Sequence, residues 1–336
     1  MAQVGRLTRP NPQLIDDRTL ELHDQAPPER TRRAAPWIGR GPGRPASVPI
    51  GATVDNQTTG GAVPGPLPSA YAAPVCLLLF AWQVESSYPL TVAANRDERL
   101  ERPARSFEVL REQHPRVVGG HDDLAGGTWL AINEHGVVAG LTNRPSPGGR
   151  DPTKRTRGEL PLVLTGERTA AAGVETLVRR VRPNEYNPAW LLVGDRRSLF
   201  YLEMVPDRPI SVRQLAPGFH VLENAPLDQP SPKSERIGSL VSEPSRSGGP
   251  LWSRLPSVLA DHMVPSTVLT DGPDPEPPVT RLPATLAACV HTEGYGTRSS
   301  TLVRVPTAPN SQPQMLVADG PPCTTSFVEV TSLWAR

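Results

Sequence analysis

Cys76 marks the point in the sequence at which a proline-rich stretch without apolar periodicity gives way to apolar runs. Prolines recur throughout residues 1–75, and the apolar residues between them repeat at neither a helical nor a strand period. A segment so poor in aliphatic clusters cannot bury enough surface to offset the entropy lost on ordering. From Cys76 onward, apolar runs begin at once. The sequence therefore predicts a disordered, Pro/Arg-rich extension over residues 1–75 and one folded domain over residues 76–336.

Two interpretations of the extension stay open. It is either a real tail, retained or removed by processing, or a stretch upstream of the true start. Val75 directly precedes Cys76, and valine is what an internal GUG codon encodes. Bacteria and archaea use GUG as a start codon, where it is read as methionine. Translation from that codon would place methionine directly before Cys76.

Charge and hydropathy exclude two classes of partner. The net charge is +1 and neither sign dominates a long block, whereas nucleic-acid binding needs clustered Lys and Arg. The longest apolar run, Val75 to Trp82, is far shorter than the ~20 residues of a transmembrane helix. We therefore expect a soluble protein with a small-molecule substrate or ligand, no nucleic-acid partner and no membrane span. The oligomeric state is not predicted.

The cysteines are few and widely spaced. There are three of them, Cys76, Cys289 and Cys323, and they form neither a C-x-x-C motif nor a spacing typical of zinc sites. An odd number argues against a disulfide framework and favours a reducing, cytoplasmic location. No metal site is predicted, and Cys289 is expected to be a buried packing residue.

The pattern from Cys76 predicts antiparallel strands with segregated helices, an α+β fold. No alternating strand–helix repeat and no G-x-G-x-x-G motif is present. One strand pair is expected to turn at Gly136. The predicted strands are 76–82, 90–94, 127–133, 137–143, 189–193, 198–203, 210–215, 219–224, 285–291, 299–305 and 325–332, and the predicted helices are 159–182, 232–243 and 251–262.

Four short motifs in a fixed order carry a family resemblance. They are Cys76 followed by Ala94-Asn95-Arg96-Asp97-Glu98, then Gly126-Gly127-Thr128-Trp129-Leu130 running on to Asn143, then Arg157-Gly158-Glu159-Leu160, and finally Gly294-Tyr295-Gly296-Thr297-Arg298. A weaker match is Leu222-Glu223-Asn224-Ala225. On these motifs the chain is identified as a member of the Asn-Arg-Asp-Glu (NRDE) family, also called the transport and Golgi organisation protein 2 family.

That family resembles the N-terminal-nucleophile (Ntn) hydrolases, above all the branch with bile-salt hydrolases and penicillin V acylases. The resemblance implies an αββα sandwich, in which two antiparallel sheets lie between helix layers. It also implies a mature chain that begins with cysteine. The positions that match the site of that branch are Cys76, Arg96, Asp97, Asn143, Asn224 and Arg298.

These residue types suit amide hydrolysis. An N-terminal cysteine combines a nucleophile with a base, because its α-amino group has a pKa near ~8. A neighbouring Arg96 would favour the thiolate, and Asp97 could hold the α-ammonium or orient that arginine. Asn143 and Asn224 could steady an oxyanion. Arg298 could bind a substrate carboxylate.

Each residue also has a structural interpretation. Cys76 could be a buried thiol, the Asn95–Glu98 stretch a solvated turn, and Trp129 a core residue. His291 is interpreted as a core histidine in a buried strand. Glu159 fits the first turn of a helix or a structural ion pair.

The resemblance leaves two functions open. One is hydrolysis of a carbon–nitrogen amide bond by Cys76 after its amine is exposed, with no cofactor. The other follows from the family's links to haem handling and lipid metabolism, and is a non-catalytic carrier of haem or an acyl lipid in the same cleft. Any haem would bind non-covalently, because no C-x-x-C-H motif is present. With residues 1–75 attached, the nitrogen of Cys76 is an amide and cannot act as a base.

Overall fold

The computed structural model describes residues 76–242, 249–265 and 283–335. The predicted extension at residues 1–75 lies outside the described residues, so its disorder stays a prediction. Within the described part, fourteen strands form two sheets in which every neighbouring pair is antiparallel. The predicted α+β class is confirmed.

The first sheet, here sheet A, has the order β10-β1-β2-β12-β13-β14, with β11 paired to β12. Its strands are β1 Leu77–Trp82, β2 Leu90–Arg99, β10 Gly218–Leu222, β11 His291–Thr292, β12 Tyr295–Val305, β13 Gln314–Ala318 and β14 Val328–Glu329. Sheet B runs in chain order through β3 Ala104–Arg111, β4 Val117–Asp122, β5 Leu130–Asn133, β6 Val138–Asn143, β7 Ala189–Gly194, β8 Leu199–Met204 and β9 Ser211–Gln214.

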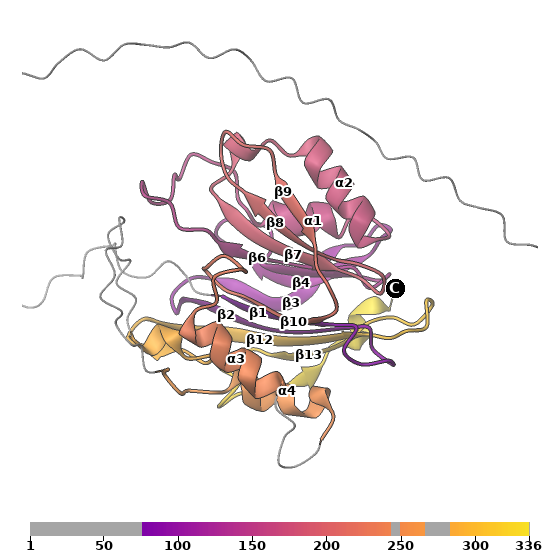
Figure 1. The fold of residues 1–336 in the computed structure, drawn as a ribbon, viewed down its shortest axis with the longest axis vertical. Coiled ribbons are helices and arrows are strands. Elements are labelled where there is room, and N and C mark those ends of the chain that lie inside the picture. Colours follow the sequence, from indigo (N-terminus) through magenta and orange to yellow (C-terminus); the bar gives the residue numbers. More distant parts are fainter. Residues whose placement is uncertain (1–75, 243–248, 266–282, 336) are drawn as a thin grey trace, which may run out of the picture. The chain divides into compact units, whose positions relative to one another are not determined.

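Four α-helices lie outside the two sheets. Helices α1 (Glu159–Leu164) and α2 (Ala170–Arg180) cover sheet B, and α3 (Pro232–Ser242) and α4 (Leu251–Leu259) cover sheet A (Figure 1). Short 3-10 turns are formed by Pro183–Glu185, Pro283–Leu286 and Thr331–Trp334.

Three apolar cores define the layers. Strand β1 is buried on both faces, and its residues alternate between two of these cores. Leu78 and Phe80 pack in the core between the sheets, whereas Leu77 and Leu79 pack against α3 and α4. A third core joins α1 and α2 to sheet B through residues such as Leu160 and Leu177. The layer order is therefore helix, sheet, sheet, helix, which confirms the expected αββα sandwich.

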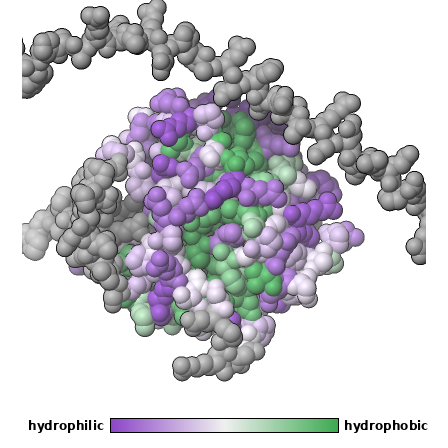
Figure 2. Space-filling model, viewed as in Figure 1, coloured by the Kyte–Doolittle hydropathy of each residue, from purple (hydrophilic) through white to green (hydrophobic). Residues whose placement is uncertain are grey.

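One face of the molecule exposes apolar residues. Figure 2 shows hydrophobic residues gathered in the middle of the view, crossed by a band of hydrophilic residues and surrounded by others. Within the described ranges, no helix is long and apolar enough to cross a bilayer.

The predicted helix over 159–182 is two helices. Thr165 ends α1, and the side chain of Thr169 accepts a hydrogen bond from the amide of Ala172 to begin α2 (3.2 Å). A threonine N-cap satisfies an amide that would otherwise lack an intrahelical partner. The Thr-Gly-Glu-Arg-Thr stretch from 165 to 169 is thus a cap-to-cap turn.

Three strands were not predicted, namely β3, β4 and β13. In β4, positions 119 and 120 have no room for a side chain and are glycine, so the apolar alternation typical of a strand is missing there. A Cβ on Gly119 would lie 2.3 Å from the carbonyl oxygen of Leu130, and one on Gly120 would lie 2.0 Å from the Trp129 ring. Strand β3 is half-exposed at the sheet edge and shows little apolar pattern.

The predicted C-terminal strands are shorter than expected. Residues 285–291 form the end of a 3-10 turn and a loop, and only His291 and Thr292 pair with β12. The interpretation of His291 as a core residue is wrong, because its two-residue edge strand leaves the side chain exposed. Residues 325–332 contain only the two-residue strand β14 and part of a 3-10 turn.

Candidate functional site

Strand β2 distributes the Asn95–Glu98 stretch over both faces of sheet A. Ala93 lies in the core against the helices and Ala94 in the core between the sheets. Because side chains alternate along a strand, Asn95 and Asp97 face α3 and α4, whereas Arg96 and Glu98 face sheet B. The four motif residues therefore build two connected sites.

Cys76 lies at the end of sheet A where β1 begins. Leu77 pairs with Asn95 on one side, and Leu78 pairs with Leu222 on the other. Extending both registers by strand geometry sets Cys76 between Arg96 and Asn224. The resemblance thus named three positions that the folded chain brings onto adjacent strands.

The Cys76 thiol is protonated in this environment. Burial and the carboxylate of Asp97 raise its pKa to about 12, although the Arg96 guanidinium and the backbone amide of Asp97 act in the opposite direction. At pH 8 a thiol with that pKa is ionised to only about one part in ten thousand. With its nitrogen in a peptide bond to Val75, Cys76 has a donor amide beside it and no base of its own.

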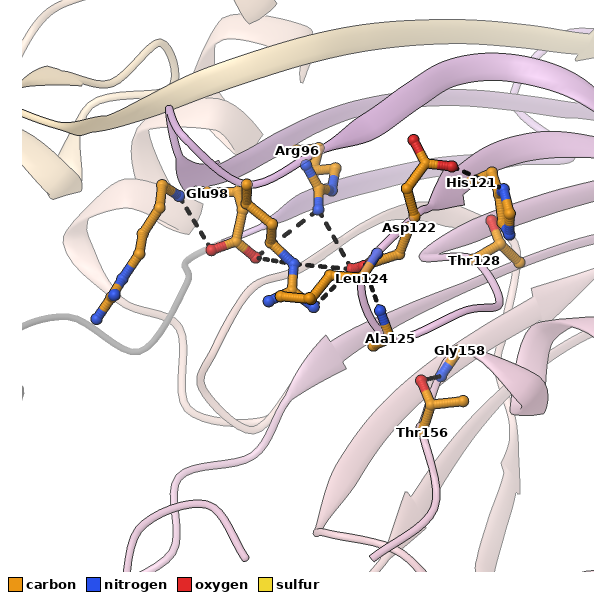
Figure 3. A network of polar contacts seen from close by, with 12 residues as sticks. Arg96, Glu98, His121, Asp122, Leu124, Ala125, Thr128, Thr156 and Gly158 are labelled. Atoms are coloured by element: carbon orange, nitrogen blue, oxygen red, sulfur yellow. Dashed lines mark hydrogen bonds and ion pairs between the residues drawn. The ribbon is translucent and has the colours of Figure 1, made fainter. Parts of the chain in front are cut away.

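Arg96 is held on the sheet B side of β2 by a ring and two carboxylates. Its guanidinium lies 4.4 Å from the centre of the Trp129 ring, and Nη2 lies 3.5 Å from Asp122 and 3.8 Å from Glu98 (Figure 3). Its buried Nη1 makes no hydrogen bond with any residue that the structure describes. Asp97 is therefore not the carboxylate that orients Arg96.

Asp122 is the anchor of this network. Its Oδ1 accepts hydrogen bonds from the amides of Leu124 (3.1 Å) and Ala125 (2.9 Å), and its Oδ2 accepts one from Arg102 (2.9 Å). Burial opposes ionisation, but the Ala125 amide and the Arg102 guanidinium outweigh it and lower the pKa of Asp122. The carboxylate is charged at neutral pH and fixes the position of Arg96.

Asp97 is fully buried on the opposite face, next to a buried lysine. Lys233 Nζ lies 3.4 Å from Asp97 Oδ2, and the Thr297 hydroxyl donates to Asp97 Oδ1 at 2.6 Å. Burial raises the pKa of Asp97, while Lys233 and the Thr297 hydroxyl counteract that effect. The ammonium next to Asp97 is thus a side chain from the first turn of α3.

Lys233 was missed by the sequence analysis, although a signal exists. It lies four and eight residues before Ile237 and Val241, which are both buried on α3. A lysine at the start of an apolar helical stripe faces the core and needs a buried anion. It is one of only two lysines in the chain.

Asn95 joins β2 to the end of α4 and to the segment before β11. Its Nδ2 donates to the carbonyl oxygens of Leu259 (2.9 Å) and Ala288 (2.8 Å), and its Oδ1 accepts from the Ser300 hydroxyl (2.6 Å). Asn95 was not placed among the site residues, and its role here is to position the chain.

The two predicted asparagines come from different sheets. Asn143 ends β6 and is half-buried, whereas Asn224 follows β10 and is buried. The hydroxyl of Thr142 donates to the carbonyl oxygen of Glu223 (2.8 Å), which ties the residues directly before them together. Both asparagines therefore lie at the end of the sandwich at which β1 begins.

Arg298 stands apart from this group. It is the extra residue of a β-bulge, since Thr297 pairs with Asp97 and Ser299 with Arg96. Its guanidinium donates to the carbonyl oxygen of Leu100, beyond the end of β2. The bulge turns Arg298 toward the rim, so it contacts neither Arg96 nor Asp97 through the bonds that the structure shows.

Arg157 is a further residue near Cys76 that the sequence analysis left as part of a motif. The thiol of Cys76 is among the groups that affect its pKa, which burial and the nearby Arg150 lower to about 10. Arg157 Nη1 donates to the carbonyl oxygen of Pro188 at 3.1 Å. A second guanidinium thus lies close to the candidate nucleophile.

Two motifs hold each other in place next to Arg157. Gly127 has φ +77° and packs so closely on Gly158 that a Cβ would lie 2.5 Å from the Gly158 carbonyl carbon. The amide of Thr128 donates to the carbonyl oxygen of Gly158 (3.0 Å). The expected structural role of Trp129 is also confirmed, because its ring packs between the sheets as well as under Arg96.

The arrangement places the guanidiniums of Arg96 and Arg157 near a buried thiol, with the carboxylates of Glu98 and Asp122 against Arg96. Glu159 lies in the first turn of α1 and forms an ion pair with Arg155, so both of its structural interpretations are confirmed. A separate group of possible metal ligands lies behind sheet A, and it includes the buried Cys289.

Comparisons with known proteins agree with the motifs. A sequence model described as Transport and Golgi organisation 2 matches residues 75–312. The Transport and Golgi organization protein 2 homolog of Bos taurus is 28% identical over 253 residues, which are 69% of this chain and 88% of that protein. The homolog of Homo sapiens is 28% identical over 255 residues, with the same coverage of both chains.

Among solved structures, the chain is similar to the Caenorhabditis elegans ortholog of N-acylethanolamine-hydrolyzing acid amidase. That match has a TM-score of 0.42 and 13% identity, and covers 71% of this chain and 98% of that one. A mutant conjugated bile acid hydrolase from Clostridium perfringens matches with a TM-score of 0.40 and 11% identity, over 76% and 96% of the two chains. On the family match, which spans well over half of its length, the chain belongs to the Transport and Golgi organisation 2 family.

Proposed function

We propose that this protein hydrolyses a carbon–nitrogen amide bond, with Cys76 as the nucleophile once its α-amino group is free. The observation that carries the proposal is the position of Cys76, at a strand end between Arg96 and Asn224 with the amide of Asp97 directed at its thiol. The fold is hydrolase-like, and the motifs resemble those of enzymes that begin with cysteine.

The reaction balances with groups that lie at this end of the sandwich. The thiol would transfer its proton to the α-amine, and sulfur would attack the carbonyl carbon. The oxyanion would be bound by the side-chain amides of Asn143 and Asn224. The C–N bond would break as the leaving nitrogen takes the proton, and water would then cleave the thioester. Arg96 and Arg157 would stabilise the thiolate.

The pKa of about 12 makes exposure of the amine the controlling step. While Val75 remains attached, the thiol is neutral and no adjacent base exists. We expect alkylation of Cys76 in that chain to rise tenfold per pH unit through pH 6–9, because the thiolate fraction rises in proportion. Once the amine is free, alkylation at neutral pH should be at least about tenfold faster.

The test compares the full chain with one in which methionine directly precedes Cys76, a residue small enough for removal of that methionine. Intact mass would establish the free amine, and peptide mapping would measure iodoacetamide modification of Cys76 separately from Cys289 and Cys323. A panel of N-acyl amides would be screened for release of the amine. Cys76→Ala should abolish hydrolysis while keeping the circular dichroism spectrum and melting temperature.

A chain with a proven free Cys76 amine that neither alkylates faster nor cleaves any amide would contradict the proposal. The alternative of a haem or acyl-lipid carrier would then be tested on the same protein. A saturable Soret band or saturable acyl-chain binding that survives Cys76→Ala would support that role.

A further inference from the structure

Four possible metal ligands from three separate segments of the chain meet behind sheet A. His262 follows α4, Cys289 and His291 lie at the start of β11, and Cys323 follows β13. One ligand atom from each lies within 4.8 Å of all the others. The spacing of these residues in the sequence does not match a known zinc motif. The two nearest ligands form a Cys289-x-His291 pair, and the other two lie in separate segments.

The distances fit a tetrahedral zinc ion. With Zn–S near 2.3 Å and Zn–N near 2.05 Å, the ligand atoms of a tetrahedron are about 3.8 Å apart for two sulfurs and about 3.6 Å for sulfur and nitrogen. The two sulfurs, Cys289 Sγ and Cys323 Sγ, are 3.7 Å apart. His291 Nε2 lies 3.5 Å from the first and 3.3 Å from the second.

The fourth ligand is held by a hydrogen bond of its own. Nδ1 of His262 is 3.2 Å from the carbonyl oxygen of Cys289, and its ring centre is 5.1 Å from that of His291. A metal-binding histidine commonly donates its other ring N–H to a carbonyl, which fixes the tautomer. With the proton on Nδ1, the lone pair of His262 is on Nε2 and available to the ion.

We propose that His262, Cys289, His291 and Cys323 bind one structural Zn²⁺. Two sulfurs and two imidazole nitrogens in a tetrahedron are the donor set that zinc prefers, and four protein ligands leave no open position for catalysis. Binding releases the two thiol protons to solvent, so two thiolates neutralise the ion and both histidines stay neutral.

A disulfide between Cys289 and Cys323 is the rival arrangement. It would need the sulfurs to approach to about 2.05 Å and would leave the convergence of both imidazoles on the same point without a function. The 3.7 Å separation matches two ligands of one ion instead.

The zinc site would fasten the loops on which the Asn95–Glu98 stretch depends. Asn95 donates to the carbonyl oxygen of Leu259, three residues before His262, and to that of Ala288, directly before Cys289. The amide of Cys289 donates to the carbonyl oxygen of Asp261 at 2.9 Å. The ion would thus hold the same two loops from behind.

The same support reaches Asp97. The amide of Val290 is bonded to the Thr297 hydroxyl (2.9 Å), which donates to Asp97. The ligand segment from Cys289 to His291 is therefore connected to the buried Asp97–Lys233 pair by two hydrogen bonds through Thr297. This role does not depend on whether Cys76 is a nucleophile.

The experiment uses the full chain, purified under reducing conditions with zinc sulfate and dialysed against a weak chelator. Elemental analysis should give about one zinc per chain, and X-ray absorption should show two sulfur and two nitrogen ligands. Replacing zinc by Co²⁺ should produce visible d–d bands with sulfur-to-cobalt charge transfer. A strong chelator should lower the melting temperature.

Variants separate the cluster from other cysteines and histidines. Cys323→Ser and His291→Ala change exposed side chains, and each should reduce the retained zinc at least about tenfold. Cys76→Ser and His114→Ala, which alter a cysteine and an exposed histidine outside the cluster, should retain it in full. The chelator should not lower the melting temperature of Cys323→Ser.

Three results would overturn the proposal without relying on any variant. One is a reduced, zinc-loaded wild-type chain that keeps no zinc after dialysis. The second is bound zinc whose absorption spectrum shows no sulfur ligand. The third is a Cys289–Cys323 disulfide that re-forms in the presence of zinc, which would assign the two cysteines to the rival arrangement.

Discussion

Two opposite charges are buried together behind the candidate nucleophile. Asp97 and Lys233 are 0% and 1% exposed, and their charged atoms are 3.4 Å apart. A buried ion pair adds little net stability, but removal of one partner leaves an uncompensated charge in the interior. Removing either residue is therefore expected to lower the free energy of unfolding by much more than the intact pair contributes to it.

We expect Lys233→Met to lower the free energy of unfolding by about 3–5 kcal/mol, because methionine fills a similar volume but leaves Asp97 unpaired. Adding Asp97→Asn should recover much of that loss. Urea unfolding of the two single variants and the double variant measures this coupling. The matched control is Lys154→Met, which alters the other lysine and should change stability by less than about 0.5 kcal/mol. Equal urea midpoints for wild type and Lys233→Met would show that no such charge is stranded.

At the scale of elements, two glycines in one turn provide an internal comparison. Gly126 and Gly127 both have positive φ, at +73° and +77°. A Cβ on Gly126 meets nothing within 4 Å, whereas one on Gly127 meets the backbone of Gly158. The first substitution is thus strained only in its dihedral angle, and the second also displaces the segment that carries Arg157.

Gly126→Ala should therefore cost about 1–2 kcal/mol of unfolding free energy, the usual penalty for the left-handed region. Gly127→Ala should cost at least about 1 kcal/mol more, because the Gly158 backbone must move. Chemical denaturation of both variants gives the comparison. Equal losses would mean that the contact between the two motifs yields easily and does not fix the position of Arg157.

The elements also show what sequence reasoning can and cannot reach. The bounds of strands with continuous apolar runs, such as β1 and β7, were predicted to within a residue or two. Burial on both faces requires an apolar residue at every position, and such a run is visible in the sequence. Strand β4 was missed because close packing on Leu130 and Trp129 requires glycine at two of its positions. A strand cannot be recognised from its pattern of apolar side chains where close packing allows only glycine.

The candidate site also has a part that the sequence predicts and a part that it does not. The register of β1 with its two neighbours brings Cys76, Arg96 and Asn224 together, as the family resemblance led us to expect. The partner of Asp97 is set by helix α3, which is distant in sequence, and the bulge at Arg298 is set by pairing between β2 and β12. The His262, Cys289, His291 and Cys323 group depends on three loops, so no spacing rule could find it.

At the scale of the whole molecule, sheet A belongs to two cores at once. Leu78 packs toward sheet B and its neighbour Leu79 packs toward α3 and α4, and both are 1% exposed. A rigid sheet shared by two cores couples them, because the loss of either core exposes one face of the same strands. The described layers should therefore unfold together and not one after the other.

Leu78→Ala and Leu79→Ala should each reduce the free energy of unfolding by about 2–5 kcal/mol, the range for a leucine removed from a packed core. Leu124→Ala, at an exposed leucine, should change it by less than about 0.5 kcal/mol. In a Trp252→Phe background, far-UV circular dichroism and tryptophan fluorescence should give coincident denaturation curves for all three variants. The other tryptophans of the described part, Trp82, Trp129, Trp190 and Trp334, lie in the core between the sheets, whereas the helices dominate the dichroism. If Leu79→Ala instead separated the two curves, with the dichroism changing first, α3 and α4 would be an independently unfolding layer. Lys233 could then leave Asp97 without global unfolding, and the environment of Cys76 would change with the state of that layer.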